Sequence, residues 1–149
     1  MRSMVEVISD AAQRRDVVAA TEQLIDREVS SKGGISGMAI KAGYKAVKKL
    51  KGGRMIPAVI DGMLEEFVGA IEPMHARYRE SGDGGGFGRF LQSNTTEAAN
   101  GLLGITDARA QRTEHALLRK TYQKLRPMGE KNVAAALPGV GQMIDRFCA

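Results

Sequence analysis

The chain has little of what a sheet-based core requires. Its 149 residues include no tryptophan, and aromatic residues make up only 5% of the total, so the apolar 43% consists largely of aliphatic side chains and eight methionines. Sandwiches and barrels favour aromatic and β-branched residues, and their strands alternate apolar and polar side chains, a period that no segment here shows. The composition therefore predicts an all-α fold.

Cysteine and long apolar runs are also scarce. The single cysteine, Cys148, excludes an intramolecular disulfide, which fits a reducing compartment. The first residues lack the apolar segment of a signal peptide, and no apolar run approaches the length of a transmembrane helix. We therefore expect a cytoplasmic protein.

Groups that bind metals or act in catalysis are few. His75 and His115 are the only histidines, and no spacing typical of zinc ligands relates them to each other or to a pair of cysteines. Cys148 lies next to the C-terminal residue, where a nucleophile would be held poorly. We expect no metal, no cofactor and no enzymatic activity.

Acidic residues are absent from the stretch that holds the excess of positive charge. The net charge is +5, yet residues 30–54 contain seven bases and no acid, whereas residues 55–86 contain two bases and six acids. The first stretch therefore favours an anionic partner, unless the acids that follow it in the chain neutralise its charge.

Residues 35–51 form the clearest amphipathic pattern in the chain. Apolar or small residues recur every three or four positions on one side, and lysines gather on the other. The apolar side comprises Ile35, Met38, Ala39, Ala42, Ala46 and Leu50, and the basic side comprises Lys41, Lys45, Lys48 and Lys49. We expect a helix that packs its apolar side on the core, exposes its lysines and ends at Gly52 and Gly53.

The rest of the chain predicts further helices separated by glycine and proline. The expected helices span residues 4–29, 57–80, 87–92, 113–126 and 130–147, and another begins at Asn94. Within 4–29, Ser9 or Asp10 can cap a turn, and a break near residues 13–15 stays open. A glycine-rich loop covers 81–86, and Pro138-Gly139 divides the last range. Asn94 followed by Glu97 resembles a capping box. Residues 1–149 are thus expected to form a single helical domain, a compact bundle of about six or seven helices.

Five segments of the sequence resemble a known family. They are SKGGISGMAIKAGYKAVKKLKGG, IPAVIDGMLEEFVGAIEP, GLLGITDARAQR, RKTYQKLRP and AALPGVGQMID. Together they resemble a family of small bacterial proteins, common in actinobacteria, that is classed as a domain of unknown function. The resemblance covers roughly residues 5–147. It implies a single helical domain, and it implies no activity, ligand or site residue.

The basic helix supports two functional hypotheses. The first is binding of a protein partner, or of a second copy of the chain, by electrostatic attraction. The alternative is peripheral binding of the same helix to an anionic membrane. The residues assigned to either role are Lys41, Lys45, Lys48, Lys49, Lys51 and Arg54. The alternative without a binding role is that the lysines only contact water. A further hypothesis is that an apolar ligand binds between helices.

Two other ligand classes are less favoured by the sequence. Nucleic acid is disfavoured because neither arginine nor a series of aromatic residues interleaves with the lysines. An anion could bind to backbone N–H groups where the basic helix begins. The residues assigned to that weaker site are Lys32, Gly34, Ser36 and Gly37, although the Gly-Lys-Ser/Thr ending of a phosphate-binding loop is missing.

Overall fold

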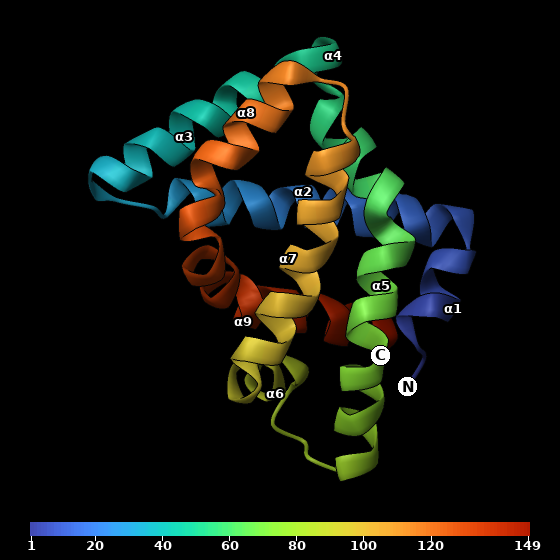
Figure 1. Ribbon diagram of the computed structural model, residues 1–149. Coiled ribbons are helices and arrows are strands. Elements are labelled where there is room, and N and C mark those ends of the chain that lie inside the picture. The colour runs from blue at the N-terminus through green and yellow to red at the C-terminus, as the bar shows by residue number, and fades with distance from the viewer.

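The computed structural model describes all 149 residues and contains helices and no strand, which confirms the all-α fold (Figure 1). The elements are α1 (Met4–Ser9), α2 (Ala11–Ser30), α3 (Gly34–Lys48), α4 (Leu50–Gly53), α5 (Met55–Ser81), α6 (Phe87–Ser93), α7 (Thr95–Arg112), α8 (Ala116–Leu125), the 3-10 turn η1 (Arg126–Met128) and α9 (Gly129–Cys148). α4 is one turn in which Lys51 and Gly52 have left-handed dihedral angles, so the chain forms eight helices rather than six or seven.

Two side-chain caps divide the N-terminal segment into α1 and α2. The Glu6 N–H donates to Ser3 Oγ at 3.2 Å and the Ser3 N–H donates to Glu6 Oε2 at 2.8 Å, which is a capping box. Asp10 has an extended backbone, and its Oδ2 accepts a hydrogen bond from the Gln13 N–H at 2.8 Å. The expected helix over residues 4–29 is therefore two helices that meet at Asp10.

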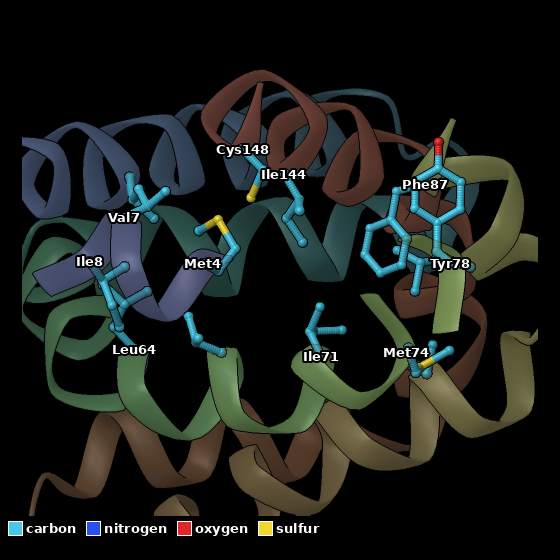
Figure 2. Close-up of a cluster of buried hydrophobic side chains, with 14 of the residues drawn as sticks. Met4, Val7, Ile8, Leu64, Ile71, Met74, Tyr78, Phe87, Ile144 and Cys148 are labelled. Carbon is cyan, nitrogen blue, oxygen red and sulfur yellow. The ribbon is translucent and has the colours of Figure 1, made fainter. Parts of the chain in front are cut away.

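The core lies between α1, α2, α5, α6, α7 and α9 (Figure 2). Fifteen buried residues form it, and Phe87 and Leu91 of α6 and Leu137 of α9 have no exposed surface. Full burial of one such side chain contributes about 1.5–3 kcal/mol, so this cluster is the main source of stability. α3, α4 and α8 contribute no residue to it.

α6 and α9 cross with their backbones in contact at two glycines. A Cβ atom on Gly88 would lie 2.8 Å from the carbonyl oxygen of Pro138, and one on Gly141 would lie 2.7 Å from the carbonyl carbon of Phe87. The same contact explains why α9 continues through Pro138, contrary to the expected division. Packing of Pro138 and Gly141 against α6 offsets the backbone hydrogen bond that proline removes.

Asn94 does not form the expected capping box. Its side-chain Nδ2 donates to the Phe90 carbonyl at 2.9 Å, so it closes α6 rather than opening α7. Glu97 instead accepts two hydrogen bonds, at 2.7 and 2.9 Å, from the guanidinium of Arg77 on α5. The prediction was wrong because an arginine on another helix offers a stronger, bidentate partner than one backbone N–H.

α3 and α8 lie side by side at the end of the molecule away from α6 (Figure 1). Gly43 allows the close approach, because a Cβ atom at that position would lie 2.9 Å from Thr121 Cγ2. α8 has no buried residue, and neither helix reaches the core cluster. The two helices therefore form an outer layer with much of their surface free for another molecule.

Candidate functional site

The exposed face of α3 is the candidate functional site, and it differs from the expected one. Ile35 is 89% exposed and Met38 is 70% exposed, whereas Ile40 and Val47 are buried. Ala42 and Ala46 are exposed as well. The prediction that this apolar side packs on the core is therefore wrong for these four residues: the helix is turned so that they face solvent together with lysines.

The opposite side of α3, the inner stripe, carries Ile40, Tyr44, Val47 and Lys48 and packs against the rest of the protein. Tyr44 Oη and Lys48 Nζ both donate to Asp26 Oδ1 of α2 at 2.6 Å. Partial burial disfavours ionisation of Asp26, but these two hydrogen bonds hold its pKa below the usual value. With Gly43 against α8, the inner stripe has specific polar and close-packing partners that the outer stripe lacks, and these partners decide the orientation.

The acids of α5 do not neutralise the lysines of α3. Asp61 and Glu65 pair with Arg14 of α2, whose Nε and Nη1 lie 2.8 and 2.6 Å from the carboxylate oxygens. Glu66 lies 3.8 Å from a nitrogen of Arg112. Asp61, Glu65 and Glu66 of α5 are thus paired with arginines of α2 and α7.

Three lysines of α3 remain unpaired and exposed. Lys41, Lys45 and Lys49 have no carboxylate within 4.0 Å, and Lys49 is the C-cap residue of the helix. Lys48 lies apart from them because it is bound to Asp26. The exposed face therefore joins three free cations to two large apolar side chains, Ile35 and Met38, with no acid in the helix.

The other assigned cations lie beyond the end of α3. Lys51 is exposed with a left-handed φ of 53°, and Arg54 is exposed and donates from Nε to the Lys51 carbonyl at 3.2 Å. Both belong to the α4 turn and its C-cap. The expected end of the basic helix at Gly52 and Gly53 is wrong, because α3 ends at Lys48 and the left-handed dihedral angles begin at Lys51, before either glycine. They extend the cationic surface along the chain without being part of the α3 face.

The weaker anion-binding residues surround the first turn of α3. Lys32 Nζ lies 3.8 Å from Glu28 Oε2, and the Gly37 N–H donates to the Gly33 carbonyl at 3.1 Å. Gly34 has a φ of 71°, and Ser36 is exposed. Because Lys32 is paired with Glu28 and the Gly37 N–H bonds to a backbone carbonyl, fewer groups are free to bind an anion than the sequence predicted. Anion binding here stays a prediction.

A buried polar cluster that sequence reasoning did not identify lies on α5. His75 has no exposed surface, and its Nδ1 lies 3.2 Å from Arg79 Nη1, while Arg79 Nη2 donates to Glu72 Oε1 at 2.9 Å. A guanidinium can only donate, so Nδ1 accepts and the proton lies on Nε2, which has no partner. Burial, together with Arg79, lowers the pKa of His75. The spacing of these residues, three and four positions apart, was the available signal.

The remaining chemical groups form neither a reactive thiol nor a metal site. Cys148 has no exposed surface, and burial raises its pKa to about 11, so its thiol is not a nucleophile at neutral pH. No group of three or more His, Cys, Asp or Glu side chains is arranged to hold a metal ion. A cavity of about 80 Å³ between α5, α7 and α8, with Met63 and Leu118 among its lining residues, is small beside the roughly 300–1,000 Å³ of typical ligand pockets. A more open hollow of about 460 Å³ lies between α2 and the start of α5, and Glu22 and Arg54 are among its lining residues. None of the helices combines the length and the apolar character needed to cross a membrane.

Comparison with known proteins gives one match. Residues 4–148 match the model of a family of unknown function, DUF6918. No curated protein and no solved structure matches the chain. The geometry of the exposed α3 face is therefore the basis for any statement about function.

Proposed function

The chain belongs to the DUF6918 family of unknown function, and we propose that it is a non-enzymatic protein that binds peripherally to an anionic membrane surface through the exposed face of α3. One observation supports this most directly. An acid-free helix places Ile35 and Met38, both largely exposed, beside the unpaired Lys41, Lys45 and Lys49. Apolar side chains next to a cationic row are the features by which helices bind the interface of anionic bilayers.

The expected affinity is modest and depends on salt. A lysine near an anionic surface contributes about 1 kcal/mol, so three contribute about 3 kcal/mol. Partial insertion of two large apolar side chains adds about 2–3 kcal/mol, because full burial of each would give about 1.5–3 kcal/mol. The sum of about 5–6 kcal/mol corresponds to a dissociation constant on the order of 0.1 mM in accessible lipid. Binding of this strength is reversible.

The dimensions of the face favour a lipid surface over a protein partner. α3 has 15 residues and is therefore about 22 Å long, and an exposed stripe about 10 Å wide covers roughly 220 Å². A stable protein interface needs about 800 Å² on each partner. A second copy would also have to offer unpaired acids, whereas Asp61, Glu65 and Glu66 of α5 are already bound to Arg14 and Arg112. A protein partner is the other outcome of the test below.

The proposal places the protein in the cytoplasm of a bacterial cell, the origin that the sequence resemblance implies. The cytoplasmic leaflet presents anionic lipid to proteins in that compartment. The unpaired and buried Cys148 is compatible with a reducing environment.

Co-sedimentation with vesicles tests the proposal. We expect the protein to pellet with phosphatidylglycerol-containing vesicles and not with pure phosphatidylcholine, and to be released as salt is raised. Lys41→Gln, Lys45→Gln and Lys49→Gln combined should abolish binding. A matched control replaces three exposed bases outside α3 and α8, Arg15→Gln, Arg89→Gln and Lys131→Gln, and should retain it.

A second readout reports insertion directly. The chain contains no tryptophan, so Ile35→Trp introduces a single fluorophore whose emission should shift to the blue on anionic vesicles. Absence of wild-type binding to anionic vesicles would refute the proposal. A salt-sensitive complex with an acidic protein, lost in the lysine variant and without any vesicle binding, would assign the face to a protein partner instead.

A further inference from the structure

α8 lies next to the docking face of α3, although about 70 residues separate the two helices in the chain. The point of closest approach is Gly43, where a Cβ atom would lie 2.9 Å from Thr121 Cγ2 and 3.8 Å from Leu125 Cδ1. Figure 1 shows the two helices side by side at one end of the molecule. Whatever surface binds the outside of α3 is therefore also close to α8.

The exposed stripe of α8 has the same chemistry as that of α3. Leu117, Lys120 and Lys124 are three and four residues apart and so share one side of the helix. Leu117 is 40% exposed, and both lysines are exposed with no carboxylate within 4.0 Å. α8 contains no acid; the acid next to it in sequence, Glu114, precedes its first turn.

The position of this stripe relative to α3 follows from the contact residues. Thr121, which contacts Gly43, lies four residues after Leu117, so the α3-facing side of α8 adjoins the stripe of Leu117, Lys120 and Lys124 at Leu117. Leu118 lies on the same side of α8 as Leu125 and lines the cavity toward α5 and α7. The stripe thus borders the α3 contact and is covered by no other element.

We infer that α3 and α8 together form one docking surface for an anionic bilayer, with α8 contributing as well as α3. The surface comprises Ile35, Met38, Lys41, Lys45, Lys49, Leu117, Lys120 and Lys124. This inference rests on the proposed function and extends it. α8 has 10 residues and is about 15 Å long, so with a stripe about 10 Å wide it raises the area of the surface only to roughly 370 Å². This is still below the area of a stable protein interface.

The cation type indicates what the surface recognises. All five cations are lysines, which are compact point charges, whereas recognition of a particular phosphate geometry generally uses the planar fork of arginine. The surface should therefore respond to the density of negative charge and not to the identity of the headgroup. Vesicles of phosphatidylglycerol and of phosphatidylserine with equal charge should bind equally.

Substitutions on α8 test the inference. Lys120→Gln with Lys124→Gln should weaken binding to phosphatidylglycerol vesicles about 25-fold at low salt, since each lysine near the surface contributes about fivefold. The matched control, Arg89→Gln with Lys131→Gln, removes the same charge and should weaken binding by less than about threefold. Leu117→Trp should shift its emission to the blue on these vesicles, and Gln92→Trp on α6, at the other end of the molecule, should not. Thermal melting of each variant verifies that it folds.

The outcomes separate this inference from the proposed function. If Ile35→Trp responds to vesicles while Leu117→Trp does not, and the α8 lysine variant binds like its control, α3 docks alone and the inference is overturned. Binding to one headgroup only, at equal charge, would overturn the claim about charge density. If the wild-type protein binds no anionic vesicle, the proposed function and the inference fail together.

Discussion

Replacement of Gly141 by alanine should destabilise the protein strongly, because α6 and α9 touch backbone to backbone at this point. The new Cβ atom would lie 2.7 Å from the carbonyl carbon of Phe87, and nearer still to N and Cα of Gly88, whereas ordinary van der Waals contact begins near 3.4 Å. No flexible side chain can move aside, so the helices must separate. That separation loosens Phe87 and Leu91, neither of which has any exposed surface.

The magnitude follows from two opposing effects. Overpacking of a dense core costs typically 1–3 kcal/mol and occasionally more, and a rigid backbone contact belongs at or above the upper limit, about 4 kcal/mol. Alanine in place of glycine within a helix returns about 1 kcal/mol. The net loss of about 3 kcal/mol corresponds to a Tm about 6–12 °C lower for a chain of this size.

Thermal melting followed by circular dichroism measures this effect against a matched control. Gly104→Ala, in α7, is the control, because a Cβ atom there meets nothing within 4 Å. It should raise the free energy of unfolding by about 0.5–1 kcal/mol through helix propensity and reduced freedom of the unfolded chain. If Gly141→Ala melts within about 2 °C of the wild-type protein while the control behaves as expected, the close crossing of α6 and α9 is refuted.

Three side-chain contacts elsewhere give further measurable expectations. Burial and Arg79 lower the pKa of His75, so this residue takes up a proton at a higher pH in the unfolded chain than in the folded one. The free energy of unfolding should therefore fall as the pH drops below about 6.5. The Tm of His75→Asn should differ less between about pH 7.5 and about pH 5 than the Tm of the wild-type protein does. Ser3→Ala removes the cap of α1 and should lower stability by about 1 kcal/mol in urea titration. Burial raises the pKa of Tyr122 and its hydrogen bond to Asp107 raises it further, so Asp107→Asn should lower this pKa in an ultraviolet titration and cost about 1 kcal/mol of stability.

Much of the local structure was available in the sequence. The aliphatic composition and the absence of period-two alternation predicted the all-α fold. The positive φ angles of Gly52 and Gly53 fit a break in the helix there, although α3 itself already ends at Lys48. These features depend on neighbouring residues alone. The predictions that failed depended on distant ones: Glu97 left its capping role because Arg77 is within reach, and α9 continued through Pro138 because α6 packs against it.

The candidate site shows the same division between local and tertiary effects. The sequence by itself determined that residues 30–54 are a cationic, acid-free segment and that most of it forms a helix. The prediction buried the stripe with Ile35 and Met38 and did not recognise the stripe with Ile40 and Val47, because helical periodicity does not show which of two apolar stripes meets the protein. Only the tertiary structure decided between them, because Asp26 binds Tyr44 and Lys48 on the second stripe and Thr121 packs against Gly43. The same packing brought α8 beside α3, and the long-range contacts that do so have no signature in the local pattern of residues.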